Sequence, residues 1–291
     1  MELEGRKFTI PLAHPIRGVQ ERTGTLYEGP HGWGEYSPFP GFPGSKERCL
    51  ESALFGAYSE WPKALRNTVP VYITVPDVSA ESARAIASGW RAAKVKVGTT
   101  EGADIRRVEA VRDVIGPTGW LMIDANAAWE VDEAVSRIDR LRRFDVALVE
   151  QPCATLEDLA RVRRLVDVPI AVDESFNSAA DAAAIRDARS ADVVVVKVQY
   201  LGGAGKALQA IEESGLPAIV SSPIETSVGV AYSAAFAASL PNLPFPCGLA
   251  TLPLLIGDVV DDPLTPKNGE IEVRKVKPSE ELLMRYATKS S

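Results

Sequence analysis

The sequence predicts an α/β protein: a barrel of the TIM type, covered by a smaller cap that the two ends of the chain form together. After Pro70, short Val- and Ile-rich runs alternate with longer amphipathic patterns, at a period of about 25 residues that is typical of a βα unit. About eight such units favour a closed barrel over an open doubly wound sheet. No GxGxxG motif follows the first of these strands, which disfavours a dinucleotide-binding sheet.

The first part of the cap is predicted over residues 1–69. Alternating apolar residues predict short strands, and the Gly-Pro-His-Gly-Trp-Gly run at 29–34 indicates a hairpin turn. The expected strands span residues 7–12, 18–25 and 26–28.

A loop and a helix complete this part of the cap. Residues 37–44 are interrupted by prolines and glycines, so they are expected to form a loop. This loop carries Phe39 and Phe42, which either cover an apolar ligand or simply pack within the loop. A helix is predicted over 46–61, because apolar residues recur there at helical spacing.

The barrel is predicted over residues 70–256. Its strands are expected at 71–75, 93–97, 120–124, 147–150, 169–172, 193–198, 218–221 and near 245–248. Its helices are expected at 79–90, 102–115, 130–144, 156–166, 179–188, 203–214 and 227–240. The tail, 257–291, breaks this rhythm with a strand at 270–276 and a helix at 279–286, and we expect it to pack back on the N-terminal region.

Composition excludes several classes of function. The net charge of −7 and the pI near 5.1 disfavour nucleic acid and anionic membranes as partners. The N-terminus lacks the apolar segment of a signal peptide, and no apolar run approaches the ~20 residues that span a bilayer. We therefore expect a cytoplasmic protein with a small-molecule partner. The sequence leaves its oligomeric state open, with a monomer favoured.

The metal-ligating residues available are mostly carboxylates. The three cysteines are scattered without CxxC spacing, which disfavours a disulfide framework or a zinc site. Only two histidines, His14 and His31, are present. A metal site would therefore consist of Asp and Glu oxygens, which favour Mg²⁺ or a similar hard cation such as Mn²⁺.

The strand at 93–97 is the most informative part of the sequence. In a strand, Lys94 and Lys96 point to one face, and Val95 and Val97 point to the other. The valine face suits packing under helices, so both lysines would point into the barrel. Two ammonium groups are costly there unless carboxylates or a polar cavity receive them. The alternative is an edge strand with two solvated lysines.

Polar side chains also follow several of the other predicted strands. The carboxyl ends of barrel strands meet at one face, so these side chains would converge in space. Taken singly, an Asp after a strand is often a helix N-cap. A lysine after four buried valines is harder to explain in this way, because an unpaired buried ammonium is expensive. The side chains in question are Asp124, Glu150, Asp173, Glu174, Lys197, Ser221 and Ser222.

This pattern predicts a carboxylate metal site between two lysines. Asp124, Glu150 and Asp173 are the expected Mg²⁺ ligands, with positions left for a substrate carboxylate. A metal-bound carboxylate has a more acidic α-proton, because the cation stabilises the enediolate. Lys96 is the expected base, with its pKa lowered by the like charge of Lys94.

The remaining polar residues are expected to support these groups. Lys197 would lie across the barrel from Lys96, and Glu174 is expected to hold Lys197. Lys94, Asn126 and Gln151 would surround the catalytic groups and the metal ligands.

The linked motifs resemble the enolase superfamily, in its muconate-lactonising subgroup. They are Lys94-Val-Lys96, Asp124-Ala-Asn126, Val149-Glu150-Gln151-Pro152, Val172-Asp173-Glu174-Ser175 and Lys197 followed by Gly202-Gly203. The likeness covers most of the chain and includes Gly32-Trp33-Gly34-Glu35 in the cap. It implies a modified (β/α)7β barrel with an α+β capping domain.

Within the subgroup, the chain resembles the o-succinylbenzoate synthase family, especially its actinobacterial forms. The short cap and the run Ser221-Ser222-Pro-Ile-Glu225-Thr-Ser227-Val-Gly229 carry this likeness. It implies Mg²⁺-dependent dehydration of 2-succinyl-6-hydroxy-2,4-cyclohexadiene-1-carboxylate to o-succinylbenzoate, a step of menaquinone biosynthesis. Lys96 would remove the α-proton and return it to the leaving hydroxide, and Lys197 would stabilise the enediolate. Ser221 and Ser222 would contact the succinyl tail.

Several alternatives stay open at this point. Some members of the family carry an Arg at the position of Met122, so this chain would hold its substrate differently. N-succinylamino acid racemisation needs a base on each face of the α-carbon, and Lys96 with Lys197 meets that need equally well. Dipeptide epimerisation is disfavoured because the Asp-x-Asp motif expected near the eighth strand is absent: residues 245–253 contain no acidic side chain. Cycloisomerisation is another possible activity, and a non-catalytic metal-binding barrel is the alternative hypothesis from a different class of function.

Overall fold

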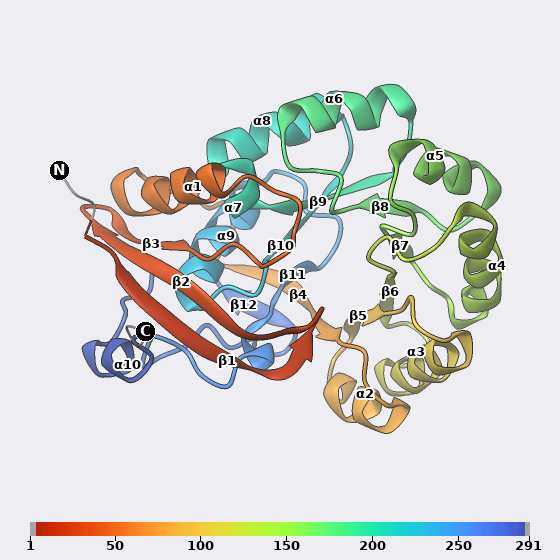
Figure 1. The fold of residues 1–291 in the computed structure, drawn as a ribbon, viewed down its shortest axis with the longest axis horizontal. Coiled ribbons are helices and arrows are strands. Elements are labelled where there is room, and N and C mark those ends of the chain that lie inside the picture. The colour runs from red at the N-terminus through yellow and green to blue at the C-terminus, as the bar shows by residue number, and fades with distance from the viewer. Residues whose placement is uncertain (1–3, 289–291) are drawn as a thin grey trace.

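A computed structural model describes residues 4–288 and shows a barrel with a cap on one side (Figure 1). The barrel strands form one parallel sheet in sequence order, and pairing of the last strand with the first closes it. The strands are β4 (Thr68–Val75), β5 (Ala92–Lys96), β6 (Trp120–Asp124), β7 (Leu148–Glu150), β8 (Ile170–Val172), β9 (Val193–Lys197), β10 (Ala218–Ser221) and β11 (Cys247–Ala250).

Helices connect the first seven barrel strands to the next strand and cover the outside of the barrel. Since no such helix follows β11 within the described residues, the (β/α)7β prediction is confirmed. The helices are α2 (Ala80–Ala87), α3 (Glu101–Ile115), α4 (Val131–Leu141) with the 3₁₀ turn η1 (Arg142–Phe144), α5 (Leu156–Leu165), α6 (Ala179–Ala188), α7 (Val198–Leu201), α8 (Ala204–Ser214) and α9 (Ser227–Ser239).

Side-chain alternation in β5 separates a helix-facing layer from the barrel interior. Val95 and Val97 belong to the apolar layer that contains Val108 and Val111 of α3. Lys94 is on the other face, next to Met122 of β6 in the strand register, and is only 6% exposed. The prediction that the lysine face points into the barrel is therefore confirmed.

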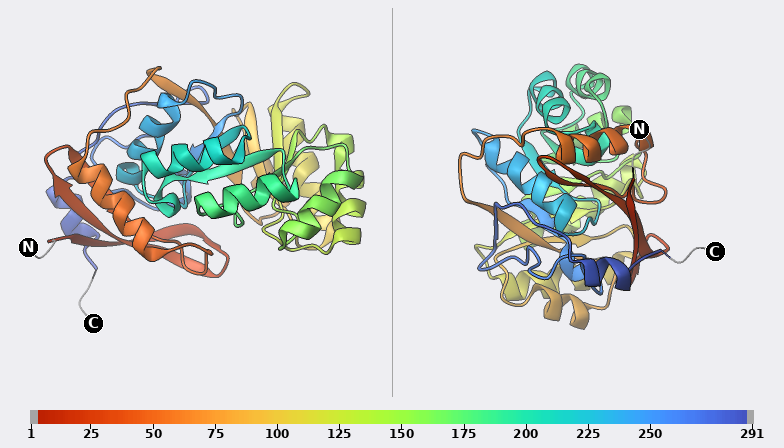
Figure 2. Two further views of the ribbon diagram at one scale, coloured as in Figure 1. Left: turned by 90° about the horizontal axis from the view of Figure 1, so that it is seen from above. Right: turned by 90° about the vertical axis from the view of Figure 1, so that its left-hand side faces the viewer.

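The cap combines both ends of the chain, as predicted. Its antiparallel sheet consists of β1 (Arg6–Ile16), β2 (Val19–Gly29) and β3 (Gly32–Tyr36), with α1 (Lys46–Tyr58) packed against β3. The C-terminal segment contributes α10 (Glu280–Arg285), which lies beside β1 (Figure 2), whereas its strand β12 (Glu270–Glu272) pairs with β4 and extends the barrel sheet. An isolated bridge joins Phe8 to Ala287, and a second joins Leu12 to Leu255. The domain limits at residues 69/70 and 256/257 stay a prediction.

Several element boundaries differ from the predicted ones. The stretches 18–25 and 26–28 form the single strand β2, because the whole stretch pairs with β1 or β3. The last barrel strand begins after Pro246, which cannot donate a ladder hydrogen bond. The tail strand is confined to Glu270–Glu272. The short helix α7 was not predicted at all.

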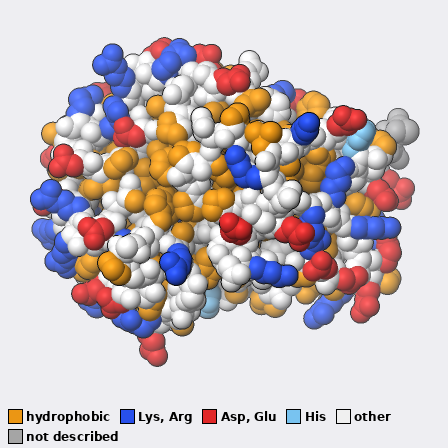
Figure 3. Space-filling view, turned by 180° about the vertical axis from the view of Figure 1, so that it is seen from behind, with side chains coloured by type: hydrophobic (Ala, Val, Ile, Leu, Met, Phe, Trp, Pro, Cys, Tyr) orange, Lys and Arg blue, Asp and Glu red, His pale blue; other side chains and the backbone are white. Residues whose placement is uncertain are grey.

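Two further features bear on the predicted partners. Within residues 4–288, no helix is long and apolar enough to cross a membrane. Basic and acidic side chains are interspersed on the face that Figure 3 shows, around a central group of hydrophobic side chains.

Candidate active site

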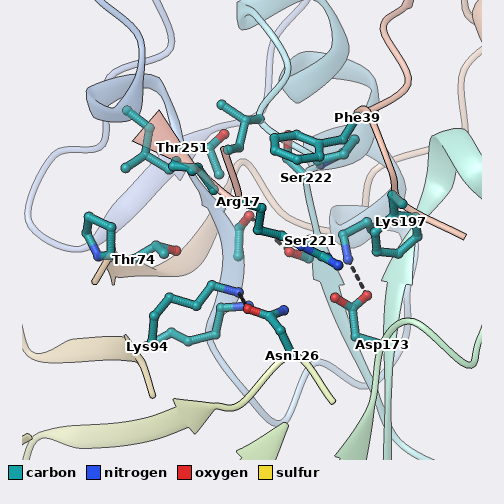
Figure 4. Close-up of a pocket in the computed structure, with 18 of the residues that line it drawn as sticks. Arg17, Phe39, Thr74, Lys94, Asn126, Asp173, Lys197, Ser221, Ser222 and Thr251 are labelled. Carbon is teal, nitrogen blue, oxygen red and sulfur yellow. Dashed lines mark hydrogen bonds and ion pairs between the residues drawn. The ribbon is translucent and has the colours of Figure 1, made fainter. Parts of the chain in front are cut away.

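A cavity of about 680 Å³, its open mouth included, lies where the carboxyl ends of the barrel strands face the cap (Figure 4). Polar side chains of the barrel line its floor, and apolar side chains of the cap, together with Arg17, line its roof. Those from the cap include Ile16, Arg17, Phe39 and Phe42, and those from the barrel include Thr74, Lys94, Lys96, Asn126, Asp173, Glu174, Lys197, Ser221, Ser222 and Thr251.

Strand pairing aligns the first group of predicted site residues. Lys96, Asp124 and Glu150 are consecutive partners across β5, β6 and β7. Both carboxylates are fully buried. The Lys96 ammonium donates to Asp124 and also to Asn126 Oδ1, 2.7 Å away. The sequence thus places the proposed base directly beside the first carboxylate.

Lys94 pairs with both of these carboxylates. Its Nζ lies 2.9 Å from Glu150 and 3.0 Å from Asp124. Burial opposes its charge, but the two carboxylates raise the pKa of Lys94 well above its usual value. Lys94 and Lys96 thus share Asp124 as a partner. The expectation that the like charge of Lys94 acts on Lys96 stays a prediction.

The pKa values of the two carboxyl groups are shifted in opposite directions. Burial disfavours ionisation of Asp124, but Lys94 and Lys96 outweigh it and hold the pKa of this carboxyl below its usual range. Burial and the neighbouring Asp124 charge raise the pKa of Glu150 well above its usual value. Additional positive charge next to Glu150 would therefore favour its ionised form.

A second group of residues lies on the far side of the cavity. β9 is four strands from β5 in a barrel of eight, so Lys197 faces the Lys94–Lys96 strand from the opposite wall. Its ammonium donates to Asp173 (Figure 4) and lies 4.3 Å from the centroid of the Phe42 ring. Gln151 Oε1 accepts from the Asp173 amide at 2.9 Å, which fixes the start of the loop after β8.

Glu174 has other partners than the predicted one. Its Oε1 accepts from Asn126 Nδ2 at 2.9 Å and from Arg17 Nη1 at 3.2 Å, whereas Lys197 pairs with Asp173. The expectation that Glu174 holds Lys197 is therefore wrong. Through these two partners, Glu174 joins the Asn126 turn to the cap.

Sequence reasoning missed Arg17 and two threonines. Arg17 occupies the turn between β1 and β2 in a left-handed conformation, with φ of 51°. The Arg17-Gly18 pair is a turn signal, but only docking of the cap brings this turn to the cavity. Thr74 and Thr251 line the cavity from β4 and from the loop after β11. Ser221 and Ser222, which were predicted, also line it, and Ser221 is the register partner of Lys197.

The donor set fits a hard cation by its chemistry. Asp124, Glu150 and Asp173 follow or end neighbouring strands and supply only carboxylate oxygens. Across residues 4–288, no three acidic, His or Cys side chains are grouped as a metal-binding cluster. Lysine ammonium groups lie against these carboxylates instead: Lys94 pairs with Asp124 and Glu150, and Lys197 pairs with Asp173.

Comparison with known proteins identifies the class. Residues 77–278 match the family model described as "Enolase C-terminal domain-like", and residues 8–54 match "Enolase N-terminal domain-like". Muconate lactonizing enzyme from Pseudomonas fluorescens, complexed with muconolactone, superposes with a TM-score of 0.86 at 18% identity, covering 98% of each chain. A dipeptide epimerase from Enterococcus faecalis, complexed with Mg and a dipeptide, gives a TM-score of 0.81 at 23% identity, covering 94% of this chain and 97% of its own.

Two curated relatives narrow the class. The o-succinylbenzoate synthase of Thermobifida fusca is 52% identical over 97% of this chain and 90% of its own length. The o-succinylbenzoate synthase of Mycolicibacterium smegmatis is 40% identical over 92% of this chain and 85% of its own length. The chain therefore belongs to the enolase superfamily, and within it to the o-succinylbenzoate synthase family.

Proposed function

We propose that this enzyme dehydrates 2-succinyl-6-hydroxy-2,4-cyclohexadiene-1-carboxylate to o-succinylbenzoate. The names of its relatives support the reaction. The observation that carries the proposal for this chain is the placement of Lys96 and Lys197 on opposite walls of one cavity, beside three buried or nearly buried carboxylates. This arrangement suits removal of a proton next to a carboxylate.

Lys96 is the proposed proton-transfer group. Its neutral amine would take the proton from the ring carbon that bears the carboxylate, and the C–H electron pair would form the new ring double bond. The C–O bond would break at the neighbouring carbon, and the Lys96 ammonium would protonate the departing hydroxide to give water. One residue can serve both steps if the proton and hydroxyl leave from the same face of the ring. The hydrogen bonds of Lys96 to Asp124 and Asn126 hold its amine at the cavity and so support this role.

Lys197 is proposed to stabilise charge from the opposite wall. Its ammonium is paired with Asp173 and stays beside the Phe42 ring, so it is held facing the cavity. A cation in this position favours negative charge that develops on the substrate and can also contact the face of the diene ring.

Asp124, Glu150 and Asp173 are the proposed ligands of Mg²⁺, or of Mn²⁺ in its place. When bound, the cation would supply positive charge at the substrate carboxylate and so acidify the adjacent C–H bond. Gln151 supports the Asp173 backbone, and Lys94 balances the charge of Asp124 and Glu150. Ser221 and Ser222 are the proposed contacts of the succinyl tail, because both hydroxyl-bearing residues line the cavity wall next to Lys197.

The test compares two substrates under the same conditions. The purified enzyme with Mg²⁺ is given the cyclohexadiene acid and, in parallel, N-succinyl amino acids in D₂O. We expect fast dehydration and slower racemisation. Lys96 and Lys197 also provide a base on each face of an α-carbon. Racemisation that is as fast as dehydration, or faster, would therefore show that the enzyme is an N-succinylamino acid racemase. Loss of both activities, with α-proton exchange on another acid, would overturn the proposed substrate.

A further inference from the structure

A buried ion pair lies directly behind the proposed base. Asp104 and Arg107, three residues apart on α3, are 1% and 2% exposed, and their charged groups are 3.1 Å apart. The mechanism proposed above uses neither side chain. A buried pair of this kind is costly unless further hydrogen bonds satisfy it, so its partners indicate what it stabilises.

Arg107 is bonded to the strand that carries Lys96. Its Nη1 donates to the backbone carbonyl of Lys96 at 2.7 Å, and its Nε donates to the carbonyl of Val78 at 2.8 Å. Its remaining nitrogen pairs with Asp77. One guanidinium therefore joins the end of β5 to the loop after β4.

Asp104 holds the loop that follows Lys96. Its Oδ2 accepts from the amides of Gly98 and Thr99, at 3.0 and 3.2 Å, and its Oδ1 accepts from the Thr99 hydroxyl at 2.6 Å. Arg137 of α4 donates to the same carboxylate at 3.2 Å. Charge-assisted bonds from two helices thus fix this loop.

The fixed loop is pressed against the turn that carries the partners of Lys96. The Val97 amide donates to the Asp124 carbonyl at 2.9 Å. Gly98 has φ of +98°, and a Cβ there would lie 2.8 Å from Ala128 and 3.0 Å from the Ala125 carbonyl oxygen. Any displacement of the loop would therefore move Lys96 relative to Asp124 and Asn126.

We propose that Asp104 and Arg107 are positioning residues for Lys96: their hydrogen bonds to the Lys96 carbonyl and the 98–99 loop set the approach of its amine to the substrate. The inference rests on the proposed role of Lys96 in proton transfer. A misplacement of about 1 Å costs on the order of 100-fold in rate. Because neither side chain reaches the cavity, substrate binding should be little affected.

The test measures kcat, KM, the pH dependence of kcat and the melting temperature of Asp104→Asn. We expect kcat to fall about 10- to 100-fold with KM within about twofold of wild type. We also expect the pH profile of kcat to shift, since the surroundings of the Lys96 amine change. Thr99→Val is a milder variant that removes one bond to Asp104; it should lower kcat, and Thr99→Ser should restore it.

An Asp–Arg pair at the other end of the barrel provides a control. Asp192 pairs with Arg163 at 2.6 Å and accepts from the Ile170 amide at 3.0 Å, where β8 begins. Asp192→Asn should lower the melting temperature and leave kcat and its pH profile unchanged. If Asp104→Asn and Thr99→Val behave like this control while Lys96→Ala is inactive, the positioning role is wrong and the proposed function stands. If the wild-type protein showed no turnover, or turnover that persisted in Lys96→Ala, both the positioning role and the proposed function would be wrong.

Discussion

At the scale of single residues, the site alternates charges of opposite sign at the ends of neighbouring strands. Lys94 and Lys96 on β5 face Asp124 and Glu150 on the next two strands, and Lys197 faces Asp173. Each ammonium therefore has a carboxylate partner in the barrel. These residues could be predicted from the sequence because strand ends in a barrel converge, whereas the actual pairs could not, because they depend on side-chain conformations. The pairing of Glu174 with Arg17 illustrates this limit.

Two neighbouring buried carboxyl groups, those of Glu35 and Glu225, predict how the stability of the fold depends on pH. Glu225 lies behind the cavity wall, next to Glu35 of the cap, with Arg22 and Gln199 facing it. Burial and the Glu35 charge raise the pKa of Glu225 from 4.5 to about 7. Between these values the folded protein holds a proton that the unfolded chain releases, so the free energy of unfolding should fall as the pH rises from about 4.5 to 7.

Glu225→Gln should remove most of this dependence and keep the hydrogen bond with Gln199. We expect the variant to be more stable than wild type at pH 8, by no more than about 3 kcal/mol, and similar to it at pH 5. Denaturant unfolding at both pH values measures the difference. Equal pH slopes for the two proteins would show that another group is responsible.

At the scale of elements, the loop at 37–44 forms part of the cavity roof. The Phe42 ring stacks on Tyr200, with centroids 4.4 Å apart, and covers Lys197.

Phe42→Ala should raise KM and lower kcat/KM about 10-fold, because the substrate ring loses an aromatic contact and the Lys197 ammonium loses its contact with the Phe42 ring. Steady-state kinetics check this. Phe55→Ala, an aromatic on α1 that is 46% exposed, is the control, and an equal effect in both variants would contradict the role of the loop.

The regular elements could largely be predicted, and the failures have local causes. The strand at Trp120–Asp124 and the helix at Ala179–Ala188 match their predicted limits, since their apolar patterns are complete within the segment. β11 follows two prolines and pairs with β4, the most distant strand in the barrel sequence, so no local pattern marks its start. Arg17, Thr74 and Thr251 were missed because the cavity exists only once cap and barrel have docked.

At the scale of the whole molecule, the cap and the barrel share the site. The cap supplies Arg17, Phe39 and Phe42, and the barrel supplies the proposed ligands and lysines. Glu35 of the cap accepts from the amides of Thr226 and Gly229 at the start of α9. This helix follows Ser221, the last residue of β10, and Ser222. The roof and the wall of the cavity are therefore joined by buried hydrogen bonds.

Metal binding should stabilise the whole fold by mass action. At a Mg²⁺ concentration of 100 times the dissociation constant, the gain is about 2.7 kcal/mol, so the melting temperature should rise by several degrees relative to protein in EDTA. Glu150→Gln removes a proposed ligand and should abolish most of this rise. Asp113→Asn, at an exposed ion pair with Arg84, should keep it. An unchanged Mg²⁺ response in Glu150→Gln would rule out Glu150 as a ligand.

The turnover of Lys96→Ala tests the central claim most directly. It is measured with the cyclohexadiene acid and Mg²⁺, beside wild type and with the melting temperature recorded for both proteins. Loss of a general base costs about 10²- to 10⁴-fold, so we expect kcat to fall by at least about 100-fold while the fold and the Mg²⁺-dependent stabilisation persist. Turnover close to that of wild type in a folded, Mg²⁺-responsive Lys96→Ala protein would contradict the account of this site.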